Sequence, residues 1–438
     1  MINREIIAKY VLTKRKGHKN SITKRYIIKR KMTKEKNSFS KISIELTKTF
    51  SKKHKKTNGI YFSHPSLIQI AWKSILNYVK QPEIKSILEP SCGSCEFICY
   101  IDKLNLNINI DGIEKDLTIF ENIKKISLTE NVNLINIDFL EFNTDKKYDL
   151  IIGNPPFFVM KADSVQKKYK KYYEGRPNIF IIFIAKSLLL LENNGILCFI
   201  LPKNFLNCLY YNPTRDHIYK NYKILEIINL DNNTFLETSQ DTILLVIQNK
   251  KELGSNSKFS LNIDKYTIFN TPDSIKELKK IYDNSTSLSK LCMNISVGKV
   301  VWNEQKNILT DDESKTRLIY NSDIINNNLE ITKYKNKQKK NYINKEGLSD
   351  CILVLNRGHG TGEYKFSYSI IDVNYKYLVE NHLICINDTQ SDSKEYKLAK
   401  YNRIIKSFED NRTKEFIKLY FGNNGININE LLYILPIY

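Results

Sequence analysis

The sequence predicts an α/β fold: a doubly wound parallel sheet followed by a smaller C-terminal α+β domain. Two observations support this prediction. From residue 61 to about 250, short apolar runs rich in β-branched residues alternate with helical segments, and this alternation is typical of parallel sheets with helices on both faces. Beyond about residue 250 the alternation stops, and the chain becomes irregular and rich in Asn, Lys and Tyr. The length of 438 residues suits two or three domains.

The expected strands are short apolar runs, and the expected helices lie between them. A polar stretch, KKELGSNSK, breaks this pattern, and we place a linker there. The sheet domain should therefore cover residues 57–250 and the second domain residues 255–438. We expect strands at residues 87–88, 108–113, 132–137, 148–152, 195–200 and 242–247, and helices at 96–104, 116–128 and 179–191.

Positive charge is concentrated near the N-terminus. Of the net charge of +21, residues 1–60 carry +16, from 19 Lys and Arg against three acids, so the remainder carries +5. We therefore expect a basic, flexible tail over residues 1–56 and a mildly basic globular part. Such a tail suits a disordered lysine-rich segment, non-specific phosphate binding, a nuclear signal or an organellar presequence, and the sequence does not choose among them.

Cysteine usage and apolar runs indicate the compartment. The eight cysteines show no regular pairing pattern and no secretory signal precedes them, which indicates an intracellular, reducing compartment, cytoplasmic or nuclear, without disulfides. The longest apolar run, residues 179–191, is interrupted by Lys186 and is shorter than the roughly 20 residues that a membrane helix needs. We expect no membrane span.

Candidate ligand-binding residues follow the first three strands, because ligands of open α/β sheets bind at the carboxyl ends of strands. The loop at residues 89–97, EPSCGSCEF, has small residues that let a ligand approach the backbone at a helix start. Glu114 follows about 20 residues later, the separation at which a carboxylate binds ribose hydroxyls. Asp138 and Phe139 end the third strand and could hydrogen-bond and flank a nucleobase. Each feature alone is common in structural loops.

The loop after the fourth strand reads Asn154, Pro155, Pro156, Phe157. Its prolines fix φ and remove two donors, which leaves carbonyls beside an amide and an aromatic ring. The amine of a planar base is a poor nucleophile, because its lone pair is delocalised into the ring. Hydrogen bonds from this amine to the Asn154 side-chain oxygen and the Pro155 carbonyl would localise the lone pair, while Phe157 holds the base flat. An Asn-Pro-Pro turn can be purely structural, but three matching loops precede this one.

Together these motifs resemble the S-adenosylmethionine-dependent amino-methyltransferases, specifically the N6-adenine DNA methyltransferases of the gamma arrangement, restriction-modification type. In that arrangement the cofactor motifs come first, the Asn-Pro-Pro-aromatic motif second and the target-recognition domain last. The resemblance is close over residues 58–250 and loose beyond. It implies a Rossmann-like methyltransferase domain, a C-terminal target-recognition domain, S-adenosylmethionine as cofactor and double-stranded DNA as partner. It also implies a monomer that could work beside a cognate restriction endonuclease.

The resemblance also assigns roles to individual residues. His64 stands where the family has Thr, and Cys95 replaces the usual second Gly of the cofactor loop, where its side chain should require a negative φ or a wider loop. Phe235 matches an aromatic on the other face of the flipped adenine. The residues matching cofactor-binding positions are Tyr61 and Pro65 in the leading motif, Glu89, Pro90, Gly93 and Phe97 in the loop, Glu114 at the ribose, Asp138 and Phe139 at the adenine, and Asn154.

Three competing signals carry less weight. Cys92, Cys95 and Cys99 form C-x₂-C-x₃-C, but no second pair or spaced His completes a metal site, so we expect no metal. Glu-x-Lys tripeptides, typical of nucleases, occur as often as chance predicts in a Lys-rich chain. The Gly-rich stretch at residues 357–362 lies outside any βαβ unit, which favours a hairpin or a DNA-approach loop where Arg357 could reach a guanine or a phosphate.

The sequence thus predicts an enzyme that flips adenine from duplex DNA, at a cost of a few kcal/mol, and methylates its N6 without a metal or a covalent enzyme intermediate. Two alternatives remain open. Methylation of RNA adenine or protein glutamine also uses Asn-Pro-Pro-aromatic loops, although the long C-terminal region speaks against the small protein-glutamine enzymes. The chain could also be a catalytically degenerate DNA-binding protein, against which the intact motif at residues 154–157 argues.

Overall fold

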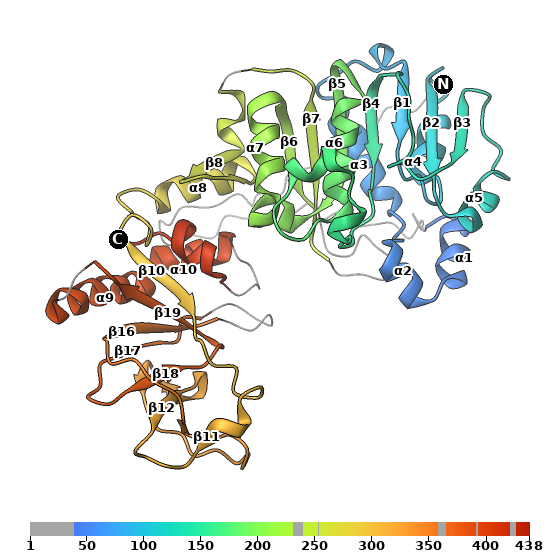
Figure 1. Ribbon diagram of the computed structural model, residues 1–438. Coiled ribbons are helices and arrows are strands. Elements are labelled where there is room, and N and C mark those ends of the chain that lie inside the picture. The colour runs from blue at the N-terminus through green and yellow to red at the C-terminus, as the bar shows by residue number, and fades with distance from the viewer. Residues whose placement is uncertain (1–38, 231–239, 253, 358–364, 391–392, 421–425) are drawn as a thin grey trace, which may run out of the picture. The chain divides into compact units, whose positions relative to one another are not determined.

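A seven-stranded sheet with the strand order β3-β2-β1-β4-β5-β7-β6 forms the centre of the N-terminal half (Figure 1). The computed structural model describes residues 39–230, 240–252, 254–357, 365–390, 393–420 and 426–438. The strands of this sheet are β1 (Ser86–Glu89), β2 (Asn109–Glu114), β3 (Val132–Asn136), β4 (Tyr148–Gly153), β5 (Leu191–Pro202), β6 (Lys223–Asn229) and β7 (Thr242–Gln248).

The sheet confirms the doubly wound α/β prediction but is not wholly parallel. Strands β1 to β5 pair in parallel, whereas β7 lies antiparallel between β5 and β6. The amino-acid pattern did not predict β6, and it predicted β7 as a further parallel strand. The crossover from β5 to β6 leaves one strand position open, and β7 fills it by pairing back on β6, which reverses its direction.

Helices cover both faces of the sheet, as expected for strands that are apolar on both sides. In β7, Ile243, Leu245 and Ile247 belong to one core, and Leu244 and Val246 to the other. The first core includes α6 (Ile179–Leu189) and α7 (Asn212–Asn221), and the second includes α3 (Pro65–Ile75), α4 (Glu96–Asp102) and α5 (Leu117–Ile123).

Two helices occupy residues that the charge pattern assigned to the tail. Helices α1 (Lys41–Thr49) and α2 (Lys52–Asn58) start at Ser40 and Ser51, whose side chains cap them. Leu46 of α1 is 2% exposed within the second core, and the Ser43 hydroxyl donates to Ser94 Oγ at 2.8 Å. The predicted boundary at residue 56 is therefore too late, because a count of lysines does not show that one face of a basic helix is buried. Residues 1–38 lie outside the described part.

The stretch predicted to be a linker packs partly onto the N-terminal half. Asn256 is buried: its amide oxygen accepts from Ile224 N at 2.7 Å and its amide nitrogen donates to Tyr222 O at 2.7 Å. The hairpin of β8 (Ser260–Ile263) and β9 (Tyr266–Phe269) follows, and Phe259 and Phe269 join the first core. The fold of the N-terminal half thus extends past residue 250.

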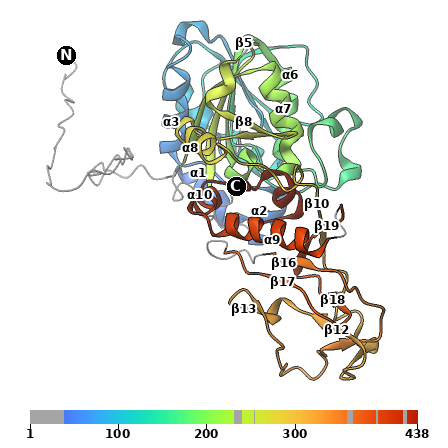
Figure 2. The same cartoon turned by 90° about the vertical axis from the view of Figure 1, so that its left-hand side faces the viewer.

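The remaining chain forms antiparallel-rich sheets with separate helices, which confirms the predicted α+β class. One sheet has the order β10-β19-β16-β17, and α9 lies along it (Figure 2). A second has the order β11-β15-β12-β18. The strands are β10 (Met293–Val297), β11 (Leu309–Thr310), β12 (Thr316–Ile319), β13 (Ile324–Ile325), β14 (Asn328–Leu329), β15 (Tyr342–Ile343), β16 (Ile352–Asn356), β17 (Tyr368–Ile371), β18 (Tyr377–Val379) and β19 (Leu383–Asp388), and the helices are α8 (Pro272–Ile281), α9 (Lys394–Glu409) and α10 (Asn411–Tyr420). Among the described helices, none combines the length and apolarity needed to cross a membrane.

Candidate active site

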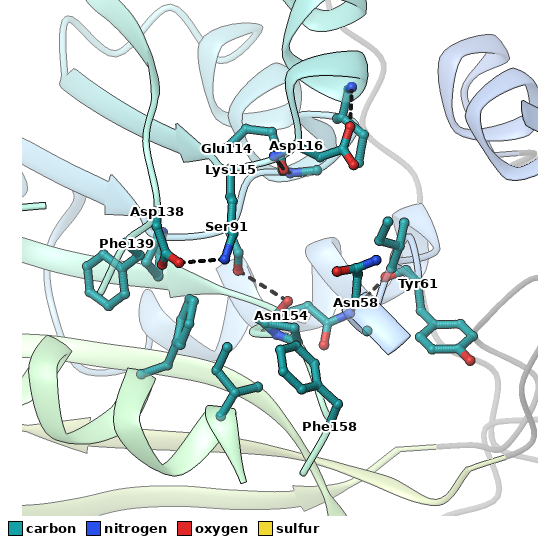
Figure 3. A pocket seen from close by; sticks show the side chains of 18 of the residues that line it. Asn58, Tyr61, Ser91, Glu114, Lys115, Asp116, Asp138, Phe139, Asn154 and Phe158 are labelled. Atoms are coloured by element: carbon teal, nitrogen blue, oxygen red, sulfur yellow. Dashed lines mark hydrogen bonds and ion pairs between the residues drawn. The ribbon is translucent and has the colours of Figure 1, made fainter. Parts of the chain in front are cut away.

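A cavity of about 320 Å³ lies at the carboxyl ends of β1 to β4 (Figure 3). Eight of the predicted site residues line it: Tyr61, Pro90, Gly93, Glu114, Asp138, Phe139, Asn154 and Pro156. The predicted residues that do not line it are Pro65, Glu89, Phe97, Pro155, Phe157 and Arg357. Loops far apart in the sequence therefore meet at one opening, as the carboxyl-end rule requires.

The loop after β1 turns tightly into α4. Gly93 and Cys95 both have positive φ, 52° and 60°. The expectation that the Cys95 side chain would require a negative φ or a wider loop is wrong: its amide donates to Cys92 O at 2.7 Å and its thiol is fully buried. Burial of the thiol holds Cys95 in a left-handed conformation that costs about 1–2 kcal/mol for a residue with a side chain.

Glu114 ends β2 and bridges two loops. Its carboxylate accepts from Gly93 N at 2.9 Å and from Asp116 N at 2.7 Å. Burial raises the pKa of Glu114 to about 7, although the backbone hydrogen bonds oppose the shift. The acid is therefore fixed in position at the cavity wall, and its charge state changes near neutral pH.

The loop after β3 is held from two sides. Asp138 forms an ion pair with Lys115 at 2.6 Å, visible in Figure 3. Lys186 of α6 donates to the carbonyls of Phe139 and Phe142, both at 2.5 Å, and its ammonium lies 4.9 Å from the Phe139 ring centroid. Burial lowers the pKa of Lys186 to about 8. Lys186, which the sequence showed only as a break in an apolar run, positions this loop.

Asn154 follows β4 with its amide oriented by the leading motif. Its amide nitrogen donates to Tyr61 O and to Ser63 Oγ, both at 3.2 Å. A carbonyl can only accept, so the nitrogen must face Tyr61 and the oxygen must face away. Asn154 Oδ1 is buried and has no donor among the described residues. An unpaired acceptor of this kind needs a partner, which a ligand amine could supply.

The segment before α3 shapes the same loop. Gly59, at φ 66°, ends α2, and a Cβ there would lie 2.8 Å from Pro156 Cβ and 2.9 Å from Phe157 N. This close approach requires glycine. His64 caps α3 with Nδ1, which accepts from Ser66 N at 3.2 Å, and Pro65 occupies the first turn, so both residues begin the helix.

A smaller cavity adjoins the first and includes Glu89, Phe97 and Asn154 in its lining. Glu89 is 2% exposed, and its Oε2 has no donor among the described residues. Burial, together with nearby Cys95 and Glu114, raises the pKa of Glu89 well above its usual value. A cationic group in this cavity would satisfy the carboxylate.

The aromatic residues after the prolines divide between core and cavity. Phe157 is half-buried and meets Phe180 edge-on at 5.9 Å between ring centroids, whereas the next residue, Phe158, lines the cavity. Ile179 and Phe183 of α6 complete this wall. No sequence motif predicted Phe158, Ile179 or Phe183 as site residues, although α6 was predicted to begin at Ile179.

Phe235 and Arg357 are the remaining predicted contact residues. Phe235 lies outside the described residues. Arg357 is exposed after β16, where its guanidinium donates to Asn381 O at 3.4 Å. The described residues contain no cluster of three or more His, Cys, Asp or Glu side chains suited to a metal.

Comparison with known proteins shows which proteins this chain is similar to. Residues 19–235 match the Eco57I restriction-modification methylase family. The Type II methyltransferase M.CvrRI of Paramecium bursaria Chlorella virus XZ-6E is 29% identical over 393 residues, covering 89% of this chain and 96% of that protein. The modification methylase CviBIII of Paramecium bursaria Chlorella virus NC1A is 27% identical over 406 residues, covering 91% and 99%. These similarities to restriction-modification methylases indicate a DNA methyltransferase.

The fold of this chain is also similar to that of a solved structure. The cryo-EM structure of a DrdV-DNA complex matches 88% of this chain and 57% of that chain, with a TM-score of 0.52 and 11% sequence identity. This likeness includes the C-terminal half and confirms the fold.

Proposed function

We propose that this methyltransferase methylates the N6 amine of adenine in duplex DNA, after the base has been extruded from the helix. The observation that carries the proposal is the buried Asn154 Oδ1, which has no donor among the described residues and is held in place by Tyr61 and Ser63. If the amine of adenine donates a hydrogen bond to this oxygen, Asn154 Oδ1 gains the partner that the folded chain does not supply. The nitrogen lone pair would then be drawn out of the ring system.

The cavity walls fit S-adenosylmethionine. Glu114 presents a fixed carboxylate for ribose hydroxyls, and Asp138 and Phe139 lie beside it for the adenine moiety. Glu89, buried with one oxygen unpaired, suits the cationic amino-acid end. When bound, S-adenosylmethionine supplies an electrophilic methyl group on a sulfonium. Asn154 adjoins both cavities, so it can contact cofactor and target amine together.

The position of the acceptor supports the proposal of extrusion. Asn154 Oδ1 is buried at the end of β4, so an amine inside a stacked base pair cannot reach it. Extrusion costs a few kcal/mol, which contacts with the flipped base must offset. We assign the base-stacking role to Phe157, and to Phe235 opposite it, and we assign Arg357 to the DNA surface of a target-recognition domain in the C-terminal half.

The test is methylation of duplex DNA by the purified protein, followed by nucleoside mass spectrometry. We expect N6-methyladenine in one sequence context, which long-read sequencing would identify. Asn154→Ala should lose methylation while cofactor affinity stays near wild type. Methylated RNA or protein glutamine without DNA product would contradict the proposal, as would an Asn154→Ala variant that keeps substantial activity.

We also propose that the protein acts as a monomer beside a separate restriction endonuclease. Support comes from its relation to Type II methyltransferases of nearly its own length. Light scattering of the protein alone and bound to DNA tests the monomer state, and a constant dimer mass would contradict it.

A further inference from the structure

We propose that residues 161–176, termed here the basic arm, hold the DNA phosphates next to the extruded base. This inference rests on the proposed function. The arm carries six cations against two acids, Asp163 and Glu174, for a net charge of +4 in 16 residues, whereas residues 61–438 as a whole carry +5. Its cations are Lys161, Lys167, Lys168, Lys170, Lys171 and Arg176, all of them exposed.

The two ends of the arm are pinned at the active-site cavity. Met160 N donates to Pro177 O at 2.9 Å, and Ile179 N donates to Phe158 O at 3.0 Å. Phe158 and Ile179 both line the cavity, so the arm begins and ends within three residues of the cavity wall. A phosphate bound by the arm would therefore lie near a base held in the cavity.

The arm is built on buried anchors, which a solvated lysine run would lack. Its 3₁₀ segment, residues Lys167–Tyr172, buries Tyr169 and Tyr172 in the first core, 2% and 4% exposed. Residues three apart share a face of a 3₁₀ helix, so Tyr169 and Tyr172 point to the same side. The lysines at positions 167, 168, 170 and 171 lie on the other two faces, which are exposed. Thr214 Oγ1 donates to Tyr172 O at 2.5 Å, which fixes the turn further.

The end of the arm is also tied down. Glu174 N donates to Tyr210 O at 2.8 Å, and Gly175, at φ 64°, lies against the Tyr210 ring, where a Cβ would approach within 2.9 Å. The arm is therefore held in one shape before any ligand binds. Pre-organised cations lose less conformational freedom on binding than flexible ones.

Within the described part of the chain, none of the six cations of the arm forms an ion pair with a carboxylate. Lys168 and Lys171 instead lie over the rings of their neighbours Tyr169 and Tyr172, at 5.1 and 5.2 Å. In another lysine-rich segment, residues 333–340, Lys340 already pairs with Asp311, and no residue of that segment lines the cavity. The arm is thus the better placed of these two phosphate-binding surfaces.

The test replaces the four lysines at positions 167, 168, 170 and 171 with Gln and measures affinity for duplex DNA across a range of salt. Each lost phosphate contact should reduce the salt slope by about 0.9, and affinity at moderate salt should fall roughly tenfold or more. Cofactor affinity should not change. Replacement of the same four by Arg keeps the charge and should preserve DNA affinity, which separates charge from folding.

A matched control replaces Lys80, Lys85, Lys103 and Lys125 with Gln. These exposed lysines lie before β1 or after α4 and α5, at the edge of the sheet opposite the cavity. These four replacements should leave the salt slope of DNA binding unchanged. An arm variant that binds like wild type, or a control variant that loses as much affinity, overturns the inference. If the wild type makes no N6-methyladenine yet the arm variant still loses DNA affinity, the proposed function fails and the arm's role stands.

Discussion

Glu114→Gln tests whether the buried acid at the end of β2 sets both stability and cofactor binding. Glu114 is 8% exposed, and burial raises its pKa from 4.5 to about 7. Between pH 4.5 and pH 7 this carboxyl is largely protonated in the folded protein and largely ionised in the unfolded chain. Its contribution to the free energy of unfolding therefore falls as pH rises between these two pKa values. From about pH 5.5 to about pH 8 the loss should be about 2 kcal/mol.

Cofactor binding should depend on pH in the opposite direction. Ribose hydroxyls donate to the carboxylate, which is the minor form below pH 7. Affinity for S-adenosylhomocysteine should therefore rise about tenfold from about pH 6 to about pH 8. The ligand's own amine titrates equally in both proteins, so the difference between wild type and Glu114→Gln isolates this residue.

Two measurements check these expectations: urea unfolding and calorimetric titration, each over that pH range for wild type and Glu114→Gln. The variant should lose the pH-dependent part of both quantities. It should also bind the ligand more weakly by about 1–3 kcal/mol, because a neutral amide replaces the charged carboxylate that accepts from the ribose hydroxyls. Identical pH profiles for the two proteins would refute the reasoning.

Three further predictions concern the tail, the stacking residue and the C-terminal half. Deletion of residues 1–38 should leave cofactor binding intact and make the salt dependence of DNA affinity shallower. Deletion of residues 1–56 should also lower the melting temperature, because it removes α1 and most of α2. Equal melting temperatures for the two deletions would contradict this. Phe157→Ala should lower the methylation rate and leave cofactor affinity unchanged, whereas Phe158→Ala, at the cavity wall, should weaken cofactor binding. Calorimetry and methylation rates test this, and weaker cofactor binding by Phe157→Ala alone would show that the two roles are exchanged. Arg357→Ala should relax the sequence preference if the side chain contacts a base, and it should weaken binding to all sequences equally if the side chain contacts a phosphate. Competition with non-cognate duplexes distinguishes the two. An unchanged sequence preference and an unchanged affinity would remove Arg357 from the DNA surface.

Much of the sheet was predictable because its strands are buried on both faces. Such strands appear as short, continuous apolar runs, and the amino-acid sequence alone is enough to place the loops after them at one edge of the sheet. Strand direction was not predictable in the same way. The residues of β7 would be equally apolar in either direction, and only its pairing with β5 and β6 fixes it as antiparallel.

The candidate site was predictable where one residue type serves one chemical role. Glu114 and Asn154 were found from their places after strands, and both line the cavity. The residues that hold Asn154 and the loop after β3 in place were not. Ser63 and Lys186 act through hydrogen bonds to groups distant in sequence, and a serine or a lysine alone gives no sign of such a partner.

The boundary after the catalytic half illustrates the same limit on a larger scale. Polar residues at 250–258 predict exposure, yet Asn256 is buried because backbone groups of residues 219, 222 and 224 satisfy its amide. Arg215 is likewise fully buried, donating to the carbonyls of Phe205, Cys208 and Thr267. Its last bond fastens the hairpin of β8 and β9 to α7, so a chain cut after Lys250 would leave buried donors unpaired and expose the apolar surface beneath Phe259 and Phe269. The unit that binds the cofactor therefore ends after this hairpin. A domain can be divided only where buried polar groups keep their partners, and the composition of the segment matters less.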